Sequence, residues 1–265
     1  MTVEVEVELD SYNRSGERLT TFVLTYPRYI HAQILTHRMF SRNAASSRAI
    51  PVQTFIDRCN ASPAVPPIWQ RNQRGMDGGE VFTDEQDVRY FNGVWERARL
   101  NAIDSAIQLM EAGVHKQWVN RLLEPFSHIT TVVTTCTPGM ENFLSQRLTD
   151  AQPEIMALAQ LIEKRWRSAV NNGILKQRDV HAPFTTPIER SEIETQKLMQ
   201  LSIARAARVS YLNHDGTRPD DRDFELFSKL KEQGHWSPFE HAAVATPGLT
   251  VDNFIGWTSG RRLFK

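Results

Sequence analysis

The most informative part of this sequence is the stretch T-H-R-M-F-S-R-N-A-A-S-S-R, from Thr36 to Arg48. It combines a His-Arg pair, an Asn, three Ser and two further Arg, and it holds no acidic residue. Small side chains let a ligand approach the backbone, while hydroxyls, free N–H groups and guanidinium forks suit a phosphate. The alternative is a capped helix end followed by a solvated basic turn.

A short helix is predicted just before this stretch, because Pro27 suits a first helical turn and apolar residues recur after it at helical spacing. Gln33 and His37 lie four residues apart, so we expect them to project from one face. The helix would then present His37 and Arg38 at the mouth of a loop of small residues.

Strands are predicted before this helix and helices after the loop. Residues 3 to 9 alternate Val with Glu, which indicates a half-exposed strand, and residues 19 to 25 form a second strand. Residues 52 to 59 can form a short helix. Residues 61 to 85 are rich in Pro and Gly and form a long connection, and we interpret residues 61 to 87 as a surface insertion.

The rest of the chain alternates helical spacing with β-forming runs. Helices dominate, so the sequence predicts an α/β or α+β fold in one domain, residues 1–265. The predicted elements are a helix at 88–112 with Gly113 as its C-terminal cap, a helix at 116–123, a strand at 128–135, a Pro138-Gly139 turn before 142–147, a helix from Pro153 to about 170, a loop at 180–188, and helices at 191–209 and 220–233.

The opening stretch resembles the signature of the flavin-dependent thymidylate synthases, in which Arg-His-Arg is followed by seven residues and Ser. Here Thr36-His37-Arg38 is followed by seven residues and Ser46. Ser41-Arg42-Asn43 is similar to the family's Ser-x-Asn, and Ser46-Ser47-Arg48 to its Ser-x-Arg. Thr36 stands where the family usually has Arg, so one cation is missing.

Further blocks resemble other elements of this family, but in a different order along the chain. In most members the counterparts of Ala204–Ser210 and His235–His241 precede the His-Arg signature. This sequence therefore resembles a circular rearrangement, which a protein tolerates when its termini lie close in space. A flavin-contacting His that the family places after the counterpart of Arg147 is absent. The blocks are Asn120–Pro125, Asn142–Arg147 with Ala151–Ile155, Ala204–Ser210 and His235–His241.

The resemblance implies a site and its residues. Arg147 and Ser46 would be catalytic, and His235 would be a mobile residue on the folate side. The nucleotide would contact Gln33, Ser46, Ser47, Arg48, Arg121 and Arg147, and FAD would contact His37, Arg38, Met39, Ser237, Glu240 and Asn142.

The resemblance also implies the activity and the architecture. It implies reductive methylation of dUMP to dTMP with FAD, methylenetetrahydrofolate and NADPH, on a mostly antiparallel sheet with long helices, in a homotetramer whose subunits share the sites. Two alternatives remain open. One is the same chemistry on another pyrimidine nucleotide, by a dCMP methylase or a hydroxymethylase. The other is a catalytically lapsed nucleotide-binding protein, suggested by Thr36 and the absent His.

Composition limits the other classes of function. The formal net charge is zero, so a broad basic surface for nucleic acid is not expected. No apolar run approaches a membrane span and the start is acidic, so we expect neither a membrane protein nor a signal peptide, but a cytoplasmic one. Cys59 and Cys136 are too few for a disulfide framework, and neither lies in an activated setting. The spacing in His235–His241 does not favour a metal.

Overall fold

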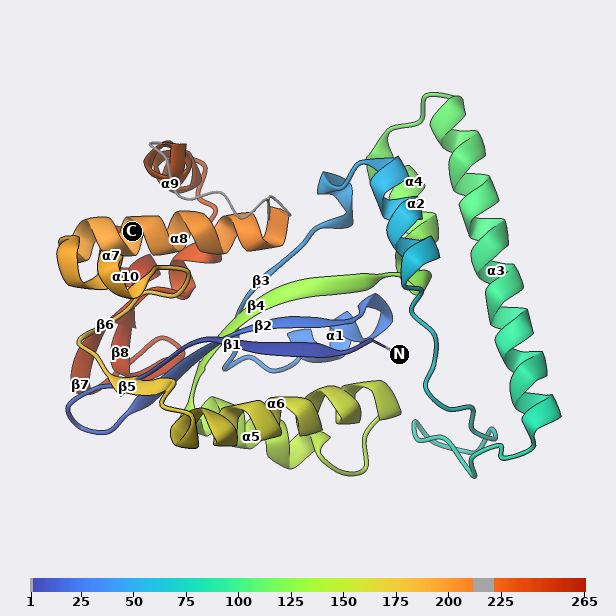
Figure 1. Cartoon of the computed structure of the whole chain (residues 1–265), viewed down its shortest axis with the longest axis horizontal. Coiled ribbons are helices and arrows are strands. Elements are labelled where there is room, and N and C mark those ends of the chain that lie inside the picture. The colour runs from blue at the N-terminus through green and yellow to red at the C-terminus, as the bar shows by residue number, and fades with distance from the viewer. Residues whose placement is uncertain (1, 212–221) are drawn as a thin grey trace.

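The computed structural model describes residues 2–211 and 222–265 (Figure 1). Within these residues the strands form one five-stranded and one three-stranded sheet. The strands are β1 (Glu4–Tyr12), β2 (Arg18–Pro27), β3 (Ser41–Ala44), β4 (His128–Cys136), β5 (Leu175–Gln177), β6 (Val180–His181), β7 (Ala243–Val251) and β8 (Phe254–Ser259). The helices are α1 (His31–Leu35), α2 (Val52–Ala61), α3 (Glu85–Glu111), α4 (Lys116–Leu123), α5 (Thr137–Arg147), α6 (Pro153–Asn171), α7 (Pro187–Glu192), α8 (Thr195–Tyr211), α9 (Arg222–Glu232) and α10 (Gly260–Phe264), with 3₁₀ turns η1 (Arg28–Ile30), η2 (Ser47–Ala49), η3 (Glu124–Phe126) and η4 (Pro238–Glu240).

The larger sheet has the order β3-β4-β2-β1-β5, and its pairings are antiparallel except that of β1 with β5. The strands predicted at 3–9, 19–25 and 128–135 lie in β1, β2 and β4. β2 and β4 pair from Leu19 opposite Cys136 to Pro27 opposite His128. The expected α+β class, with a mostly antiparallel sheet and long helices, is therefore confirmed.

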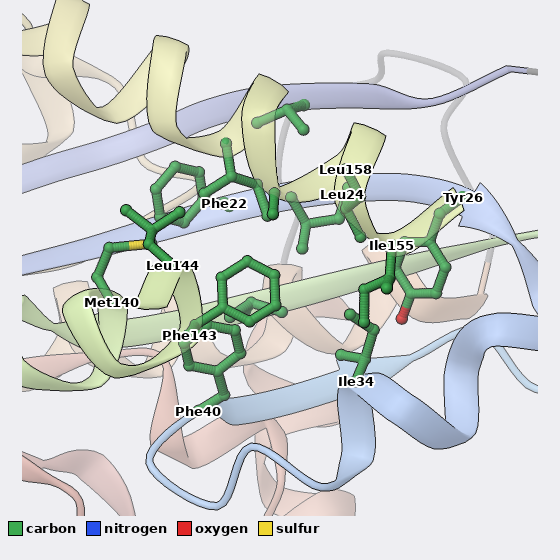
Figure 2. Close-up of a cluster of buried hydrophobic side chains, with 14 of the residues drawn as sticks. Phe22, Leu24, Tyr26, Ile34, Phe40, Met140, Phe143, Leu144, Ile155 and Leu158 are labelled. Carbon is green, nitrogen blue, oxygen red and sulfur yellow. The ribbon is translucent and has the colours of Figure 1, made fainter. Parts of the chain in front are cut away.

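One face of this sheet forms the main hydrophobic core (Figure 2). Phe22, Leu24 and Tyr26 alternate along β2, so all three point to the side that α5 and α6 cover (Figure 1). Burial of each such side chain contributes about 1.5–3 kcal/mol. The helices supply the facing side chains Met140, Phe143, Leu144, Ile155, Leu158 and Ile162.

The opposite face carries a buried series of polar side chains, which we call the hydroxyl–imidazole chain. Ser11 Oγ lies 2.8 Å from His181 Nδ1, and His181 Nε2 lies 2.8 Å from Thr21 Oγ1. Thr21 and Thr134 share a hydrogen bond of 2.7 Å, and Thr134 Oγ1 lies 2.8 Å from His241 Nδ1. All five residues are fully buried. The hydroxyl–imidazole chain therefore connects β6 and His241, the residue after η4, to strands β1, β2 and β4.

The second sheet, in the order β6-β7-β8, and helices α7 to α9 belong to this polar side, away from α5 and α6 (Figure 1). At Gly256 of β8, the second sheet packs closely against the β1–β2 turn. The φ of Gly256 is +76°, and a Cβ there would collide with the carboxylate of Glu17. Asn13 Nδ2 donates to Gly256 O at 2.8 Å. This close approach requires glycine.

Two local predictions around the signature stretch are wrong. The stretch from Thr36 to Arg48 is not all loop, because β3 lies within it and pairs with β4, Ser41 opposite Thr134. The predicted Pro138-Gly139 turn is instead the first turn of α5, where proline is favoured. Glycine is needed at 139 because a Cβ there would collide with the Thr135 hydroxyl.

The prediction for residues 180–209 is also wrong in part. The expected loop holds β6 and the start of α7, and the expected helix is broken between α7 and α8. Thr186 begins α7 through a capping box with Glu189, and Pro187 follows at the first helical position. The predicted single helix is therefore interrupted, because α7 begins separately at its own capping box.

The remaining helices confirm their predictions closely. The helices expected at 52–59, 88–112, 116–123 and 153–170 are α2, α3, α4 and α6, and Gly113 has the φ of +76° that its capping role requires. α9 lies within the expected 220–233, whose first residues, 220 and 221, lie outside the described ones. Residues 62–84 form one isolated bridge, Gln70 with Val81. None of the described helices combines the length and apolar character that crossing a membrane requires.

The hydroxyl–imidazole chain predicts sensitivity to acid. Burial lowers the pKa of His241 from 6.5 to about 3, so below pH 6.5 the unfolded chain binds a proton that the folded chain excludes. Stability therefore falls as the pH drops from 6.5 towards 3, and His241 alone should remove about 2 kcal/mol by pH 5. Urea unfolding at pH 7 and pH 5 measures this loss.

His241→Gln should reduce the loss between the two pH values, whereas His235→Gln, which removes an exposed imidazole, should leave it unchanged. Equal pH dependence in the wild type and His241→Gln would contradict the prediction.

Candidate functional site

Arg147 and His37, which belong to two different matched blocks, are in direct contact. Arg147 ends α5, its Nε donates to His37 Nε2 at 3.0 Å, and its Nη2 donates to Thr36 Oγ1 at 3.4 Å. A guanidinium only donates, so His37 Nε2 must be the unprotonated nitrogen. Burial, together with the positive charges of the neighbouring Arg147 and Arg42, lowers the pKa of His37 from 6.5 to about 4. His37 is therefore a neutral acceptor that orients Arg147.

The His37 ring is itself fixed by the main core. It is buried and meets Phe143 edge to face, with 4.9 Å between the ring centroids. Phe143 lies one turn before Arg147 on α5, so the same helix supplies the packing surface and the guanidinium. The predicted helical delivery of His37 is wrong in detail, because α1 ends at Leu35 and His37 lies in the following turn.

Gln33 faces the start of α6. Its amide donates to Gln152 Oε1, and nearby Tyr29 donates to Glu154 at 3.2 Å. Gln152, which precedes α6, is a neighbour that sequence reasoning did not assign to the site. The sequence did contain a signal for Gln152, because this residue lies in Ala-Gln-x-Glu-Ile, the block that follows Arg147.

Ser47 and Arg121 meet at a shared carboxylate. Ser47 Oγ donates to Glu124 Oε1 at 2.5 Å, and Arg121 Nη1 lies 3.1 Å from both oxygens of Glu124. Asn120 Nδ2 supports the turn by donating to Ser47 O at 2.7 Å. Glu124 was not predicted, although its place three residues after Arg121 on a helix indicates such a pair.

Ser46 and Arg48 flank this turn. Ser46 is partly buried and precedes η2, while Arg48 is exposed on it. The turn follows Ala44, the far end of β3, whereas the Arg147 contact adjoins Ser41 at its start. A four-residue strand spans about 10 Å. The predicted nucleotide residues therefore form two groups within one chain, with Gln33 and Arg147 in one and Ser46, Ser47, Arg48 and Arg121 in the other.

Asn43 connects the signature stretch to the blocks at the other end of the chain. It is buried, its Nδ2 donates to Ala206 O in α8 at 2.9 Å, and Ser237 Oγ donates to its Oδ1 at 3.4 Å. The carboxylate of Glu240 in η4 forms an ion pair with Arg261 of α10. The rearranged blocks are therefore adjacent in space although they lie apart in sequence.

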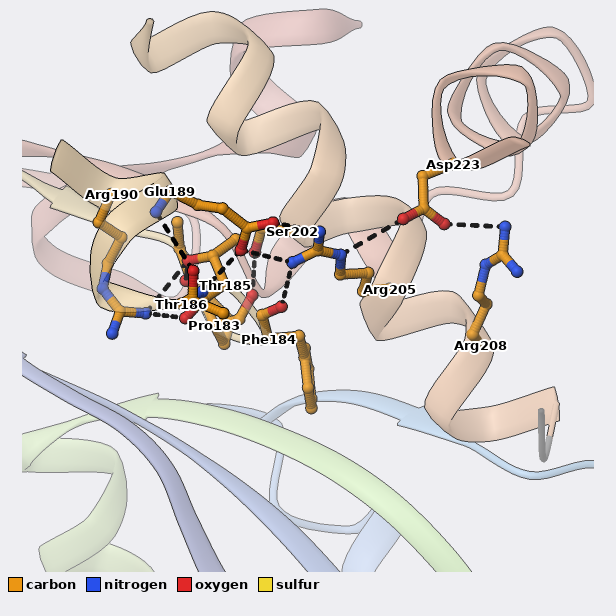
Figure 3. Close-up of polar contacts among 11 residues, drawn as sticks. Pro183, Phe184, Thr185, Thr186, Glu189, Arg190, Ser202, Arg205, Arg208 and Asp223 are labelled. Carbon is orange, nitrogen blue, oxygen red and sulfur yellow. Dashed lines mark hydrogen bonds and ion pairs between the residues drawn. The ribbon is translucent and has the colours of Figure 1, made fainter. Parts of the chain in front are cut away.

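The two arginines of the Ala204–Ser210 block support the fold (Figure 3). Arg205 binds both carboxylate oxygens of Glu189, at 2.7 and 2.9 Å, and its Nε lies 3.3 Å from Asp223. Arg208 lies 2.8 Å from the second oxygen of Asp223. Hydrogen bonds from Arg205 and Thr186 lower the pKa of Glu189 to about 2, so Glu189 is charged at neutral pH. This ion-pair network joins α7, α8 and α9.

The other predicted flavin residues have varied surroundings. Arg38 and Asn142 are exposed, and within the described ranges Arg38 has no hydrogen-bond or ion-pair partner. Met39 is half-buried and packs against the cluster that contains Phe254 and Trp257. His235 is exposed in the turn after α9. Arg38, Asn142 and His235 are therefore accessible to a ligand.

Neither cysteine is arranged as a nucleophile. Both are free and buried, and burial raises the pKa of Cys59 to about 11. Cys136 is the last residue of β4, and its Sγ lies 3.5 Å from Asn253 O. Among the described residues, no group of three or more His, Cys, Asp or Glu side chains could hold a metal ion.

Comparison with known proteins reveals a shared fold. No protein-family model matches the sequence, and no curated protein matches it. The crystal structure of the UMP/dUMP methylase PolB from Streptomyces cacaoi, bound with 5-bromo-UMP, aligns with a TM-score of 0.53 and 17% identity, over 66% of this chain and 96% of that chain. The same methylase bound with 5-bromo-dUMP gives a TM-score of 0.48 at 17% identity, over 66% of this chain and 92% of that chain. At this identity the first match shows a common fold.

Asn43→Ala should lower the free energy of unfolding by about 1–3 kcal/mol, because it removes the hydrogen bonds that the buried Asn43 side chain makes with Ala206 O and Ser237 Oγ. The matched control is Asn142→Ala, which removes an exposed amide on α5 and should change stability by no more than about 0.5 kcal/mol. Urea denaturation of both variants without ligand measures the difference. Equal stability of the two variants would show that Asn43 does not join these blocks.

Proposed function

We propose that this chain is a nucleotide methylase of the flavin-dependent thymidylate synthase type. It converts dUMP to dTMP, with methylenetetrahydrofolate as the one-carbon donor and NADPH as the reductant. The observation that carries the proposal is the contact between Arg147 and His37, two residues 110 positions apart in separately matched blocks. The fold that the chain shares with a UMP/dUMP methylase supports the same assignment.

Arg147 is the residue that activates the pyrimidine. Methylation at carbon 5 requires negative charge to develop on the ring, and a preoriented guanidinium stabilises that charge where it develops. His37 accepts the hydrogen bond from Nε, which leaves Nη1 and part of Nη2 available to a carbonyl and a ring nitrogen. Because a guanidinium keeps its proton, it acts by charge and not as an acid.

Arg121, Ser46 and Arg48 would hold the phosphate of the nucleotide. Arg121 is paired with Glu124, so the phosphate would displace that carboxylate or share the Arg121 guanidinium with it. Arg48 is exposed and Ser46 is partly exposed beside it. These residues lie at the other end of β3 from Arg147, and the family resemblance implies sites that are shared between subunits. A homo-oligomer, and specifically a tetramer, is therefore part of the proposal.

Three of the residues proposed for FAD are exposed. Arg38 offers a guanidinium without a partner among the described residues, and Ser237 and Asn142 offer an exposed hydroxyl and an exposed amide. When bound, FAD would supply the redox and one-carbon chemistry that no side chain here can provide. Cys59 and Cys136 are not required as nucleophiles, in agreement with their burial.

The test of the function is anaerobic turnover of dUMP, UMP and dCMP in parallel, together with the absorption spectrum of the purified protein. We expect bound flavin and product from dUMP in the presence of methylenetetrahydrofolate and NADPH. Product from dCMP alone would favour the dCMP methylase, and a hydroxymethyl product would favour the hydroxymethylase. A colourless protein that binds no added FAD would favour the catalytically lapsed alternative, which Thr36 suggests.

Arg147→Ala should bind FAD nearly normally but lose about a hundredfold to a thousandfold in kcat, the usual cost of removing one preorganised charged contact. Arg147→Lys should recover little, because an ammonium cannot bridge two acceptors as a planar fork does. Ser46→Ala should be milder, at about 0.5–1.5 kcal/mol for one neutral hydrogen bond. Turnover at saturating dUMP gives the ranking, and near-normal turnover in Arg147→Ala would exclude the role assigned to this residue.

A further inference from the structure

A cavity of about 420 Å³ lies between the β7–β8 turn and α10, beside β3 and η4. It is lined by Asp252 and Asn253 of the turn, Phe254 and Ser259 of β8, Arg261, Arg262 and Lys265 at the C-terminal end, Glu240 of η4 and Ser41 of β3. Glu240 is the only one of these residues that we assign to FAD. The turn and α10 belong to none of the matched blocks.

Two buried hydroxyls face this cavity. Ser41 and Ser259 are each only 3% exposed, yet both line it. Within the described ranges, neither hydroxyl has a hydrogen-bond partner. Both hydroxyls are open to the cavity. A hydroxyl held inside the protein without a protein partner is expected to serve water or a ligand. These two therefore provide donors on the inner wall.

The outer wall is cationic. Arg261 is neutralised by its ion pair with Glu240, whereas Arg262 and Lys265 are exposed and have no partner among the described residues. Asp252 opposes them at the exposed hairpin turn, where its φ is +53°. The side chains of Arg262 and Lys265 therefore place two positive charges at the cavity, and Asp252 places one carboxylate there.

This combination of groups suits a nucleotide. Hydroxyls and cations bind phosphate oxygens, and a carboxylate accepts hydrogen bonds from ribose hydroxyls. We propose that the cavity binds a phosphate group of a nucleotide cofactor, with Ser41, Ser259, Arg262 and Lys265 at the phosphate and Asp252 at the ribose. The choice of FAD and NADPH as candidate occupants rests on the proposed function, whereas the binding of ADP and pyrophosphate tests the site without the methylation reaction.

The test is calorimetric titration of the full chain with ADP and with inorganic pyrophosphate. The double variant Arg262→Ala/Lys265→Ala should bind both probes at least about tenfold more weakly, because charged hydrogen bonds are lost. The matched control is Lys164→Ala/Arg165→Ala, which removes the same charge from exposed positions on α6 and should leave both affinities unchanged. The affinity of the wild type should fall as salt is raised.

Asp252→Asn separates the two halves of the proposal. It should tighten pyrophosphate severalfold, because a repelling charge is removed, and it should not tighten ADP to the same degree, because a ribose acceptor is weakened. Displacement of ADP by FAD or by NADPH identifies the cofactor that supplies the phosphate.

Three results would overturn the proposal. These are equal ADP affinity in the cavity double variant and the α6 control, absence of binding of either probe to the wild type, and failure of both FAD and NADPH to displace ADP. All three are binding measurements, so they are independent of whether dUMP is methylated.

Discussion

Two buried imidazoles bind the C-terminal half of the molecule to the polar face of the large sheet. His181 and His241 reach Thr21 and Thr134, neighbouring threonines on β2 and β4. Burial lowers the pKa of both His181 and His241, and no carboxylate is among their bonded partners, so both imidazoles are neutral in the folded protein. Glu240 immediately precedes His241, so the position of the candidate cofactor residues depends on this one hydrogen-bonded series.

Much of this architecture could be predicted from local patterns. The Val–Glu alternation of β1, the helical spacing of α3 and the proline at the start of α6 each express a preference of the backbone itself. β3 could not be predicted in this way. Its residues, Ser41 to Ala44, have no β-forming pattern, and they are extended because β4 offers a paired edge. The Pro138-Gly139 pair was misread because proline serves turns and first helical turns equally well.

The candidate site shows the same division. Residues from separate matched blocks are in contact in the structure, Arg147 with His37 and Asn43 with Ser237, while the roles assigned to them stay predictions. The partners of Ser47 and Gln33 were missed, because Glu124 and Gln152 reach these residues from other elements. The cavity beside α10 could not be foreseen either, since Ser41, Ser259 and Arg262 come from three separate segments.

The contacts of Asn43 also have a consequence for how the molecule folds. They join residues 163 and 194 positions apart, so they close very long loops. Loop-closure entropy opposes such contacts, and chains with many of them fold slowly. Strands β1 to β4 of the large sheet and the α5–α6 core can form from residues up to 171, before α8 and η4 have been synthesised. During that interval the polar face, with Thr21 and Thr134 on it, is without its cover, and the site is completed only when the last segment docks.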